Sequence, residues 1–183
     1  MILDITWYAT EEAFSTLPTD QKISKSLQNK DIPRTFRAFL HNTHIAGEFR
    51  DNIPNWEHRL ICRHCDQNTM ENLEHILLTC KVPGQSQIWQ LAKELVRNPN
   101  TWPTMRNIGS ITRCTLANFK TQRGKQKLGD NCLFKLLLAK STMLIWFLRN
   151  WRVCANIAEE DWPTREVIRS KWISRINTRL TLD

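Results

Sequence analysis

The stretch from residue 62 to residue 80, CRHCDQNTMENLEHILLTC, holds three of the six cysteines of the 183-residue chain. One histidine, His75, stands between the second and third of these cysteines, so the spacing is C-x2-C-x9-H-x4-C. Zinc prefers four ligands in a tetrahedron, and three thiolates with one imidazole are a common structural set. A C-x2-C pair can place both sulfurs around one ion through a tight turn. The spacing therefore predicts one zinc ion bound by Cys62, Cys65, His75 and Cys80.

The same stretch also predicts where its helix ends. Residues 69–78 have a helical pattern of apolar side chains. His75 and Cys80 are five residues apart, which is about 140° of rotation on an α-helix, so both could not face one ion on an unbroken helix. We therefore expect the helix to end just before Cys80, in keeping with Pro83-Gly84 shortly after it. Four protein ligands leave no open position for water, so the zinc is expected to be structural.

Two alternatives to this ligand set remain open. His58 and His64 compete with His75 for the fourth position, although His64 would need a strained reversal within the turn. The four residues could also be no more than buried thiols and an unrelated histidine, because free cysteine is often a small buried hydrophobe. That second description is expected of the remaining cysteines, which lie in apolar or helical contexts: Cys114, Cys132 and Cys154.

Composition favours a globular and mostly α-helical protein. The chain is 41% hydrophobic and 24% charged, which is typical of a folded domain and not of a disordered chain. It has only 5 glycines and is rich in helix formers, so helices are favoured over a sandwich of short strands. We predict a mostly α-helical, irregular domain with one embedded Cys3His zinc-binding turn.

Three segments are expected to form this one integrated domain. They are an N-terminal helical segment packed on the core (1–52), a zinc-binding segment (53–102) and a C-terminal helical segment with a basic loop (103–183). Prolines predict where helices begin, one in each segment, at Pro33, Pro83 and Pro163.

A long central helix is expected from about residue 132 to about residue 157, because its apolar positions nearly circle the helix axis. Lys135 and Lys140 interrupt this apolar run, so a buried helix is favoured over a membrane span, and no membrane partner is expected. The N-terminal sequence MILDITWYATEE has no basic residue before its apolar residues, which is unlike a signal peptide. We expect an intracellular protein, nuclear or cytoplasmic, whose cysteines are reduced.

The positive charge lies after the cysteine cluster. The formal net charge is +8, and residues 83–183 carry 17 basic and 7 acidic side chains against 9 and 11 in residues 1–82. The loop FKTQRGKQK and the last helix concentrate this charge, and two nearby glycines would let the loop backbone approach a ligand. Such cations bind phosphates without reading sequence, so non-specific RNA or DNA binding is predicted. The candidate residues are Lys120, Arg123, Lys125, Lys127, Arg169, Arg175 and Arg179.

A solvated face is the competing interpretation of both basic runs. The last helix also carries an apolar stripe of Ile168, Trp172, Ile176 and Leu180 at i, i+4 spacing, which indicates that it packs on the core. Two tryptophans, Trp102 and Trp151, are candidates for stacking on bases, although a tryptophan at helical spacing is more often part of a core.

The motifs IPNWEHRLICRHCD, MENLEHILLTC and IWQLA, between Ile53 and Trp102, resemble the zinc-binding domain that follows the reverse transcriptase in non-LTR retrotransposons. The segment that precedes them, including LDITWYATEEAF, is similar to fungal members, and LAKSTMLIWFLRN and INTRLTLD are similar to the helices that follow. The family's ligands fall on the same four residues that the spacing selects. The resemblance implies a domain from a transposable element with a polymerase as a protein partner.

The chain departs from that family in lacking catalytic parts. It contains no Tyr-x-Asp-Asp motif, and a two-metal site needs several converging carboxylates. Asp4 is the only acid in a strand-like run, and residues 159–161 have the pattern of a solvated acidic turn. We expect a stand-alone, non-catalytic fragment. The alternatives are a protein-interaction module, or a degenerate element fragment without selected function.

Overall fold

The computed structural model describes residues 61–65, 68–96, 102, 105, 107–112, 114, 117–154 and 156–180. The predicted N-terminal segment 1–52, with its helix at Pro33, lies outside these residues. Two short turns of helix and four α-helices follow one another in the described part: η2 (His75–Thr79), α5 (Gln85–Glu94), α6 (Ile108–Thr112), α7 (Leu128–Cys154), η5 (Glu159–Asp161) and α8 (Arg165–Leu180). Extended pairing there is limited to two isolated bridges. The prediction of a mostly α-helical, irregular domain is confirmed.

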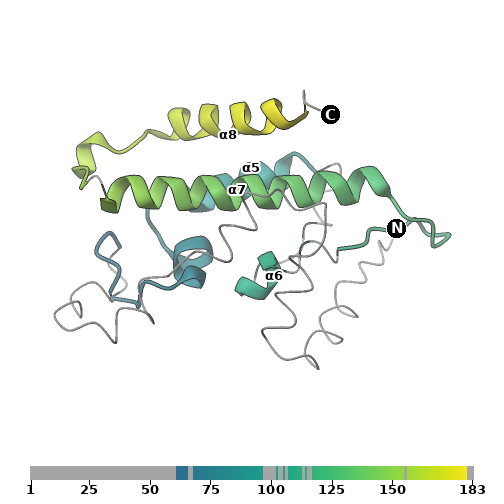
Figure 1. Cartoon of the computed structure of the whole chain (residues 1–183), viewed down its shortest axis with the longest axis horizontal. Coiled ribbons are helices and arrows are strands. Elements are labelled where there is room, and N and C mark those ends of the chain that lie inside the picture. Colours follow the sequence, from purple (N-terminus) through teal and green to yellow (C-terminus); the bar gives the residue numbers. More distant parts are fainter. Residues whose placement is uncertain are drawn as a thin grey trace.

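Helix α7 is the axis of the molecule. Phe134, Leu137, Leu138 and Leu144 are fully buried along it, as expected of an apolar helix that is covered on several sides. Helix α8 runs back along α7 in the antiparallel direction, while the zinc-binding segment and α6 lie on the other side (Figure 1). By length and hydropathy, 128–153 could also span a membrane, but 61% of its most apolar window is buried within the fold, which is the situation of a core helix.

The bounds of α7 differ from the predicted 132–157 at both ends. The helix begins four residues earlier, at Leu128, because the preceding residues form a tight hairpin that leads directly into it. It ends earlier because Asn156 adopts a positive φ of 48°, a conformation that commonly terminates helices. The amide of Ile157 then donates to the carbonyl of Arg152 at 3.2 Å and closes the last turn.

Helix α8 packs on α7 through the predicted stripe. Ile168, Trp172 and Ile176 are buried, and the indole N–H of Trp172 donates to the Ser141 hydroxyl at 3.0 Å. Leu180, which the same periodicity placed in this stripe, is exposed at the end of the helix.

Gly84 joins the zinc-binding segment to the helical core. Its φ of 112° is a backbone conformation that residues other than glycine rarely adopt, and a Cβ atom there would lie 3.1 Å from Ile168 and 3.4 Å from Leu148. Glycine therefore allows α5 to begin in contact with both α7 and α8. Helix α5 starts at Gln85, two residues after the predicted Pro83, and buries Ile88 and Ala92.

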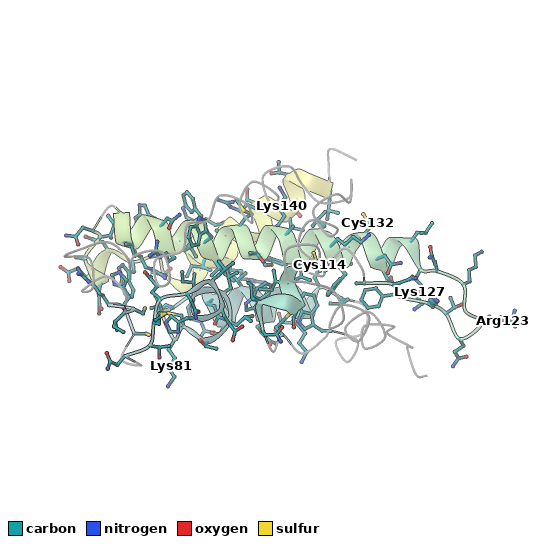
Figure 2. All side chains as sticks on the ribbon, turned by 60° about the horizontal axis from the view of Figure 1, so that its bottom comes forward. Lys81, Cys114, Arg123, Lys127, Cys132 and Lys140 are labelled. Atoms are coloured by element: carbon teal, nitrogen blue, oxygen red, sulfur yellow. The ribbon has the colours of Figure 1, made fainter. Side chains whose placement is uncertain are left out.

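The basic loop is a hairpin. Lys120 and Gln126 form an antiparallel bridge, the amide of Thr121 donates to the carbonyl of Lys125 at 2.8 Å, and Gly124 turns the chain with φ 75°. The second nearby glycine, Gly129, lies in the first turn of α7, so only one of the two predicted glycines shapes the loop. Figure 2 shows Arg123 at one end of the molecule and Lys81, next to the zinc-binding residues, towards the other.

Candidate metal centre

The first two cysteines sit on a narrow turn. Ile61 and Met70 form an antiparallel bridge, and the amide of Cys62 donates to the carbonyl of Thr69 at 2.9 Å. Asn68 adopts φ 45°, a left-handed conformation that asparagine tolerates better than most residues. This reversal brings the C-x2-C pair back toward the residues that follow Met70.

The helix that carries His75 is shorter than the predicted 69–78. Thr69 and Met70 belong to the bridge instead, and the helical turn begins at Leu73. Asn72 stabilises its start, because its side-chain oxygen accepts from the amide of His75 at 2.8 Å, which is the interaction of a helix N-cap. Met70 pairs with Ile61 and Thr69 with Cys62, so these two residues lie outside the helix that the sequence pattern predicts.

The last part of this helical turn allows His75 and Cys80 to face the same point although they are five residues apart. Residues His75–Thr79 wind as a π-helix, and the amide of Cys80 donates to the carbonyl of His75 at 2.7 Å. This i→i+5 hydrogen bond brings together two positions that an α-helix would separate by about 140°. Cys80 itself is extended (φ −63°, ψ 129°), so the helix ends just before it, as predicted.

The four predicted ligands converge. Their donor atoms all lie within 4.8 Å of one another, with Cys62 Sγ 3.9 Å from Cys80 Sγ and Cys65 Sγ 3.3 Å from His75 Nε2. In a tetrahedral zinc site with Zn–S of about 2.3 Å, two sulfurs lie roughly 3.8 Å apart, and a sulfur and a nitrogen about 3.6 Å. The 3.9 Å separation is also far longer than the ~2.05 Å of a disulfide bond. The cluster can hold a metal ion, and its donor set suits zinc.

The His75 ring is fixed in the orientation that a metal requires. The residue is buried, and its Nδ1 lies 3.1 Å from the Thr79 hydroxyl. When Nδ1 carries the proton and donates it to the Thr79 hydroxyl, the Nε2 lone pair faces Cys65, which is the tautomer that a metal bound at Nε2 requires. His75 and Thr79 are four residues apart on the same turn, so the local winding supplies both the ligand and its support.

A thiol hydrogen bond joins Cys62 and Cys80, whose sulfur atoms lie 3.9 Å apart. The hydrogen bond from Cys80 lowers the pKa of the Cys62 thiol to about 4. The same hydrogen bond, together with burial, raises the pKa of Cys80. Zinc binds the thiolate form, so a cation between the two sulfurs would displace the proton of this hydrogen bond.

Two arginines near the end of α7 support the cluster, and neither was identified from the sequence. Arg149 forms a two-pronged ion pair with the Glu71 carboxylate: its Nε donates to Oε1 at 2.9 Å, and Nη2 to Oε2. Glu71 lies directly between Met70 of the bridge and the Asn72 cap. This ion pair therefore fastens the cysteine turn to α7 across 78 residues of sequence.

Arg152 is buried beside Cys80. It donates to the carbonyl of Pro83 at 2.6 Å and stacks on the Trp162 ring, with its Cζ 4.8 Å from the ring centroid. Burial lowers the pKa of Arg152, and the electrostatic interaction with Cys80 acts in the opposite direction. Three thiolates and Zn²⁺ would carry a net negative charge, which a neighbouring guanidinium stabilises.

Neighbouring elements donate hydrogen bonds to a carbonyl and a carboxylate of the helical turn 73–79. The carbonyl of Leu77 accepts from the side chains of Gln85 and Trp89, both at 2.7 Å, which satisfies an oxygen at the open end of the turn. The Glu74 carboxylate accepts from the amide of Ile108 at 3.1 Å, at the start of α6. The candidate centre is thus connected to α5, α6 and α7.

The alternative ligands have different outcomes. The ring of His64 packs edge-on against Trp162 at 5.6 Å between centroids, and it is not part of the converging set. His58 lies outside the described residues. Cys114 is buried, as predicted, whereas Cys132 is exposed on α7, which corrects the expectation of a buried thiol. Cys132 is exposed because α7 begins before it, and its position in the second turn faces away from the core. The side chain of Cys154 is not described.

The predicted nucleic-acid residues fall on two elements. On the hairpin, Arg123 and Lys125 are exposed, Lys120 is half-buried, and Lys127 pairs with Asp130 at 3.3 Å. On α8, Arg169 is exposed, while the Arg175 guanidinium lies 5.1 Å from the centroid of the Phe147 ring. The side chain of Arg179 is not described. The hairpin stands at the start of α7, away from the metal-binding cluster (Figure 2).

The two candidate stacking tryptophans differ. Trp102 packs edge-on against Phe134 with 5.4 Å between ring centroids, so it belongs to the core. Trp151 is exposed on α7.

Comparisons with protein-family models, with curated proteins and with solved structures find no match to this chain.

Proposed function

We propose that the chain is a non-catalytic zinc-binding module whose zinc is structural. The observation that carries this proposal is the convergence of Cys62, Cys65, His75 and Cys80 within 4.8 Å. Three soft sulfur donors and an imidazole favour zinc over hard cations such as Mg²⁺ or Ca²⁺. With four protein ligands, the ion closes the turn and supplies folding energy, and it has no open position for a reacting water.

Zinc content tests this proposal. Protein purified without chelator should contain one zinc per chain, and Cys65→Ser should abolish stoichiometric binding. Cys114→Ser, in a cysteine that is buried outside the cluster, is the matched control and should keep the zinc. Zinc retention by Cys65→Ser at wild-type affinity would contradict the ligand set.

We further propose that the module derives from a non-LTR retrotransposon of the fungal type and acts inside the cell, with a polymerase as a protein partner. This part of the proposal rests on the resemblance of residues 53–102 to the zinc-binding domain that follows the reverse transcriptase. A pull-down of the polymerase that survives nuclease treatment would support a direct protein contact. A contact that nuclease abolishes would assign the association to nucleic acid instead.

Weak, non-specific binding of RNA or DNA is the third part of the proposal. It is supported by the net excess of positive charge in residues 83–183 and by the exposure of Arg123 and Lys125 at the hairpin tip. Binding through about four phosphates should give a slope of log affinity against log salt of roughly −3 for single strands.

A charge-matched pair of variants tests the hairpin. Arg123→Gln/Lys125→Gln removes two exposed cations at the hairpin, and Lys81→Gln/Lys93→Gln removes two exposed cations elsewhere. We expect the hairpin variant to lose affinity and to lower the salt slope by about one to two, with little change in the control. Equal losses in both variants would show a dependence on net charge alone, and no binding at low salt would remove the nucleic-acid proposal.

A further inference from the structure

Helix α7 presents two aromatic rings to solvent that its core packing does not use. The side chains of Phe147 and Trp151 are 46% and 37% exposed, although most of the large apolar residues of α7 are buried. They are four residues apart, so they lie on the same face with a rise of about 6 Å between them. Phe147 and Trp151 therefore lie on a face of α7 that the other described elements do not cover.

A cation on α8 lies against one of these two rings. The Arg175 guanidinium lies 5.1 Å from the centroid of the Phe147 ring. Lys171 is one turn before Arg175 on the same face of α8, and Trp151 is one turn after Phe147 on α7. Because the two helices are antiparallel (Figure 1), Lys171 and Trp151 both lie one turn from the Arg175–Phe147 contact, in the same direction along the helix pair. Lys171 is exposed.

We propose that this surface, formed by Phe147, Trp151, Lys171 and Arg175 and here called the aromatic platform, binds single-stranded nucleic acid. Unpaired bases would stack on the two rings, and the two cations would contact the adjoining phosphates. The inference rests on the proposed nucleic-acid binding and deepens it, because it names the class of ligand and a second contact surface besides the hairpin.

The combination of groups favours a single strand over other occupants. Stacking on aromatic rings is open to any base but only when the base is unpaired, since a duplex buries its base faces. A purely apolar protein or lipid partner would have to desolvate Lys171 and Arg175 without supplying a counter-charge. A strand of nucleic acid supplies both flat apolar faces and regularly spaced negative charges. The one acidic residue of α8, Glu166, lies on the opposite flank of that helix from Lys171 and Arg175.

Binding of labelled oligonucleotides to the full, zinc-loaded chain tests the platform. The probes are a 20-nucleotide oligo-dT or oligo-U strand and a blunt duplex of the same length, measured by fluorescence anisotropy at low salt. Trp151→Ala should weaken single-strand binding by about tenfold, which is within the range for the loss of one stacked base, and should change duplex binding by less than twofold. Trp151→Phe, which keeps a ring, should restore most of the affinity.

Controls separate the platform from folding and from the hairpin. Leu95→Ala shortens an exposed apolar side chain at the C-terminal end of helix α5 and should leave both affinities unchanged. Unfolding midpoints in urea confirm that the variants remain folded. Unchanged single-strand binding by Trp151→Ala, with reduced binding by the hairpin variant, would overturn the platform and leave the proposed function standing. Equal losses for strand and duplex would also overturn it, and no binding by the wild-type chain would remove both proposals.

Discussion

Replacing Arg149 with methionine should destabilise the zinc-loaded protein by about 3–5 kcal/mol. The side chains of Glu71 and Arg149 are only 7% and 13% exposed, and two hydrogen bonds join them. Removal of one partner leaves the other as an uncompensated buried charge, and a penalty of about 3–5 kcal/mol is typical of that situation. The remaining charge would be the Glu71 carboxylate, which stands inside the zinc-binding segment.

The double variant separates the cost of the orphaned charge from the value of the ion pair. Glu71→Gln/Arg149→Met removes both charges, so it should be more stable than Arg149→Met alone even though it carries more changes. Zinc affinity should follow the same order, because support behind a metal site typically contributes about 10- to 100-fold in affinity.

Urea unfolding of the zinc-loaded variants, together with competition against a zinc chelator, measures both effects. Lys127→Met is the control, because the Lys127–Asp130 pair is 28% and 43% exposed, and its loss should cost less than about 1 kcal/mol. If Arg149→Met costs no more than Lys127→Met, or if Glu71→Gln/Arg149→Met is no more stable than Arg149→Met alone, the ion pair does not fasten the cysteine turn to α7.

Four further predictions concern single features of the site. Gly84→Ala should lower the free energy of unfolding in urea by about 1–3 kcal/mol, because φ 112° is strained for alanine and its Cβ would press on Ile168; an unchanged midpoint would contradict the positive φ and the close packing at Gly84. Arg152→Met should weaken zinc binding by roughly tenfold in chelator competition, because it removes the cation beside Cys80, and an unaltered affinity would exclude that role. Zinc affinity should fall between pH 7.5 and pH 6, because protons compete with the metal for thiolates and imidazole; a flat profile would argue against sulfur ligands. Chelation should unfold the turn enough for trypsin to cleave after Arg63, as mass mapping would show, and equal protection with and without chelator would mean that the turn folds without metal.

The ligand set could be predicted from the sequence because it is encoded by short spacings. Cys62 and Cys65 share one turn, and the requirement that His75 and Cys80 face one ion predicted that the helix must end between them. Local spacing could not predict the π winding that achieves this, nor the hydrogen bonds that the side chains of Gln85 and Trp89 donate to the Leu77 carbonyl within that turn. The same is true of the first two residues of the predicted helix 69–78, because Met70 pairs with Ile61 and Thr69 with Cys62.

Contacts between distant segments were not predictable from local patterns. Arg149 and Arg152 stand near the end of an apolar helix, where isolated cations usually reach solvent, yet both turn toward the zinc-binding segment. Two arginines three residues apart on a mostly apolar helix are a signal that such a partner exists, although they do not identify Glu71. Likewise, its helical spacing made Trp151 more typical of a core residue, yet its side chain is exposed. Its exposure depends on which sides of α7 the other helices cover, and the local sequence does not specify this.

X-ray absorption at the zinc edge tests the central claim most directly, because it counts the atoms bound to the metal in the purified protein. We predict one zinc per chain with three sulfur atoms at about 2.3 Å and one nitrogen at about 2.0 Å. His75→Ala should remove the nitrogen and leave the three sulfurs. A zinc with fewer than three sulfur neighbours would contradict the Cys3His ligand set. A metal-free chain that is as stable as the zinc-loaded chain would contradict the structural role of the zinc.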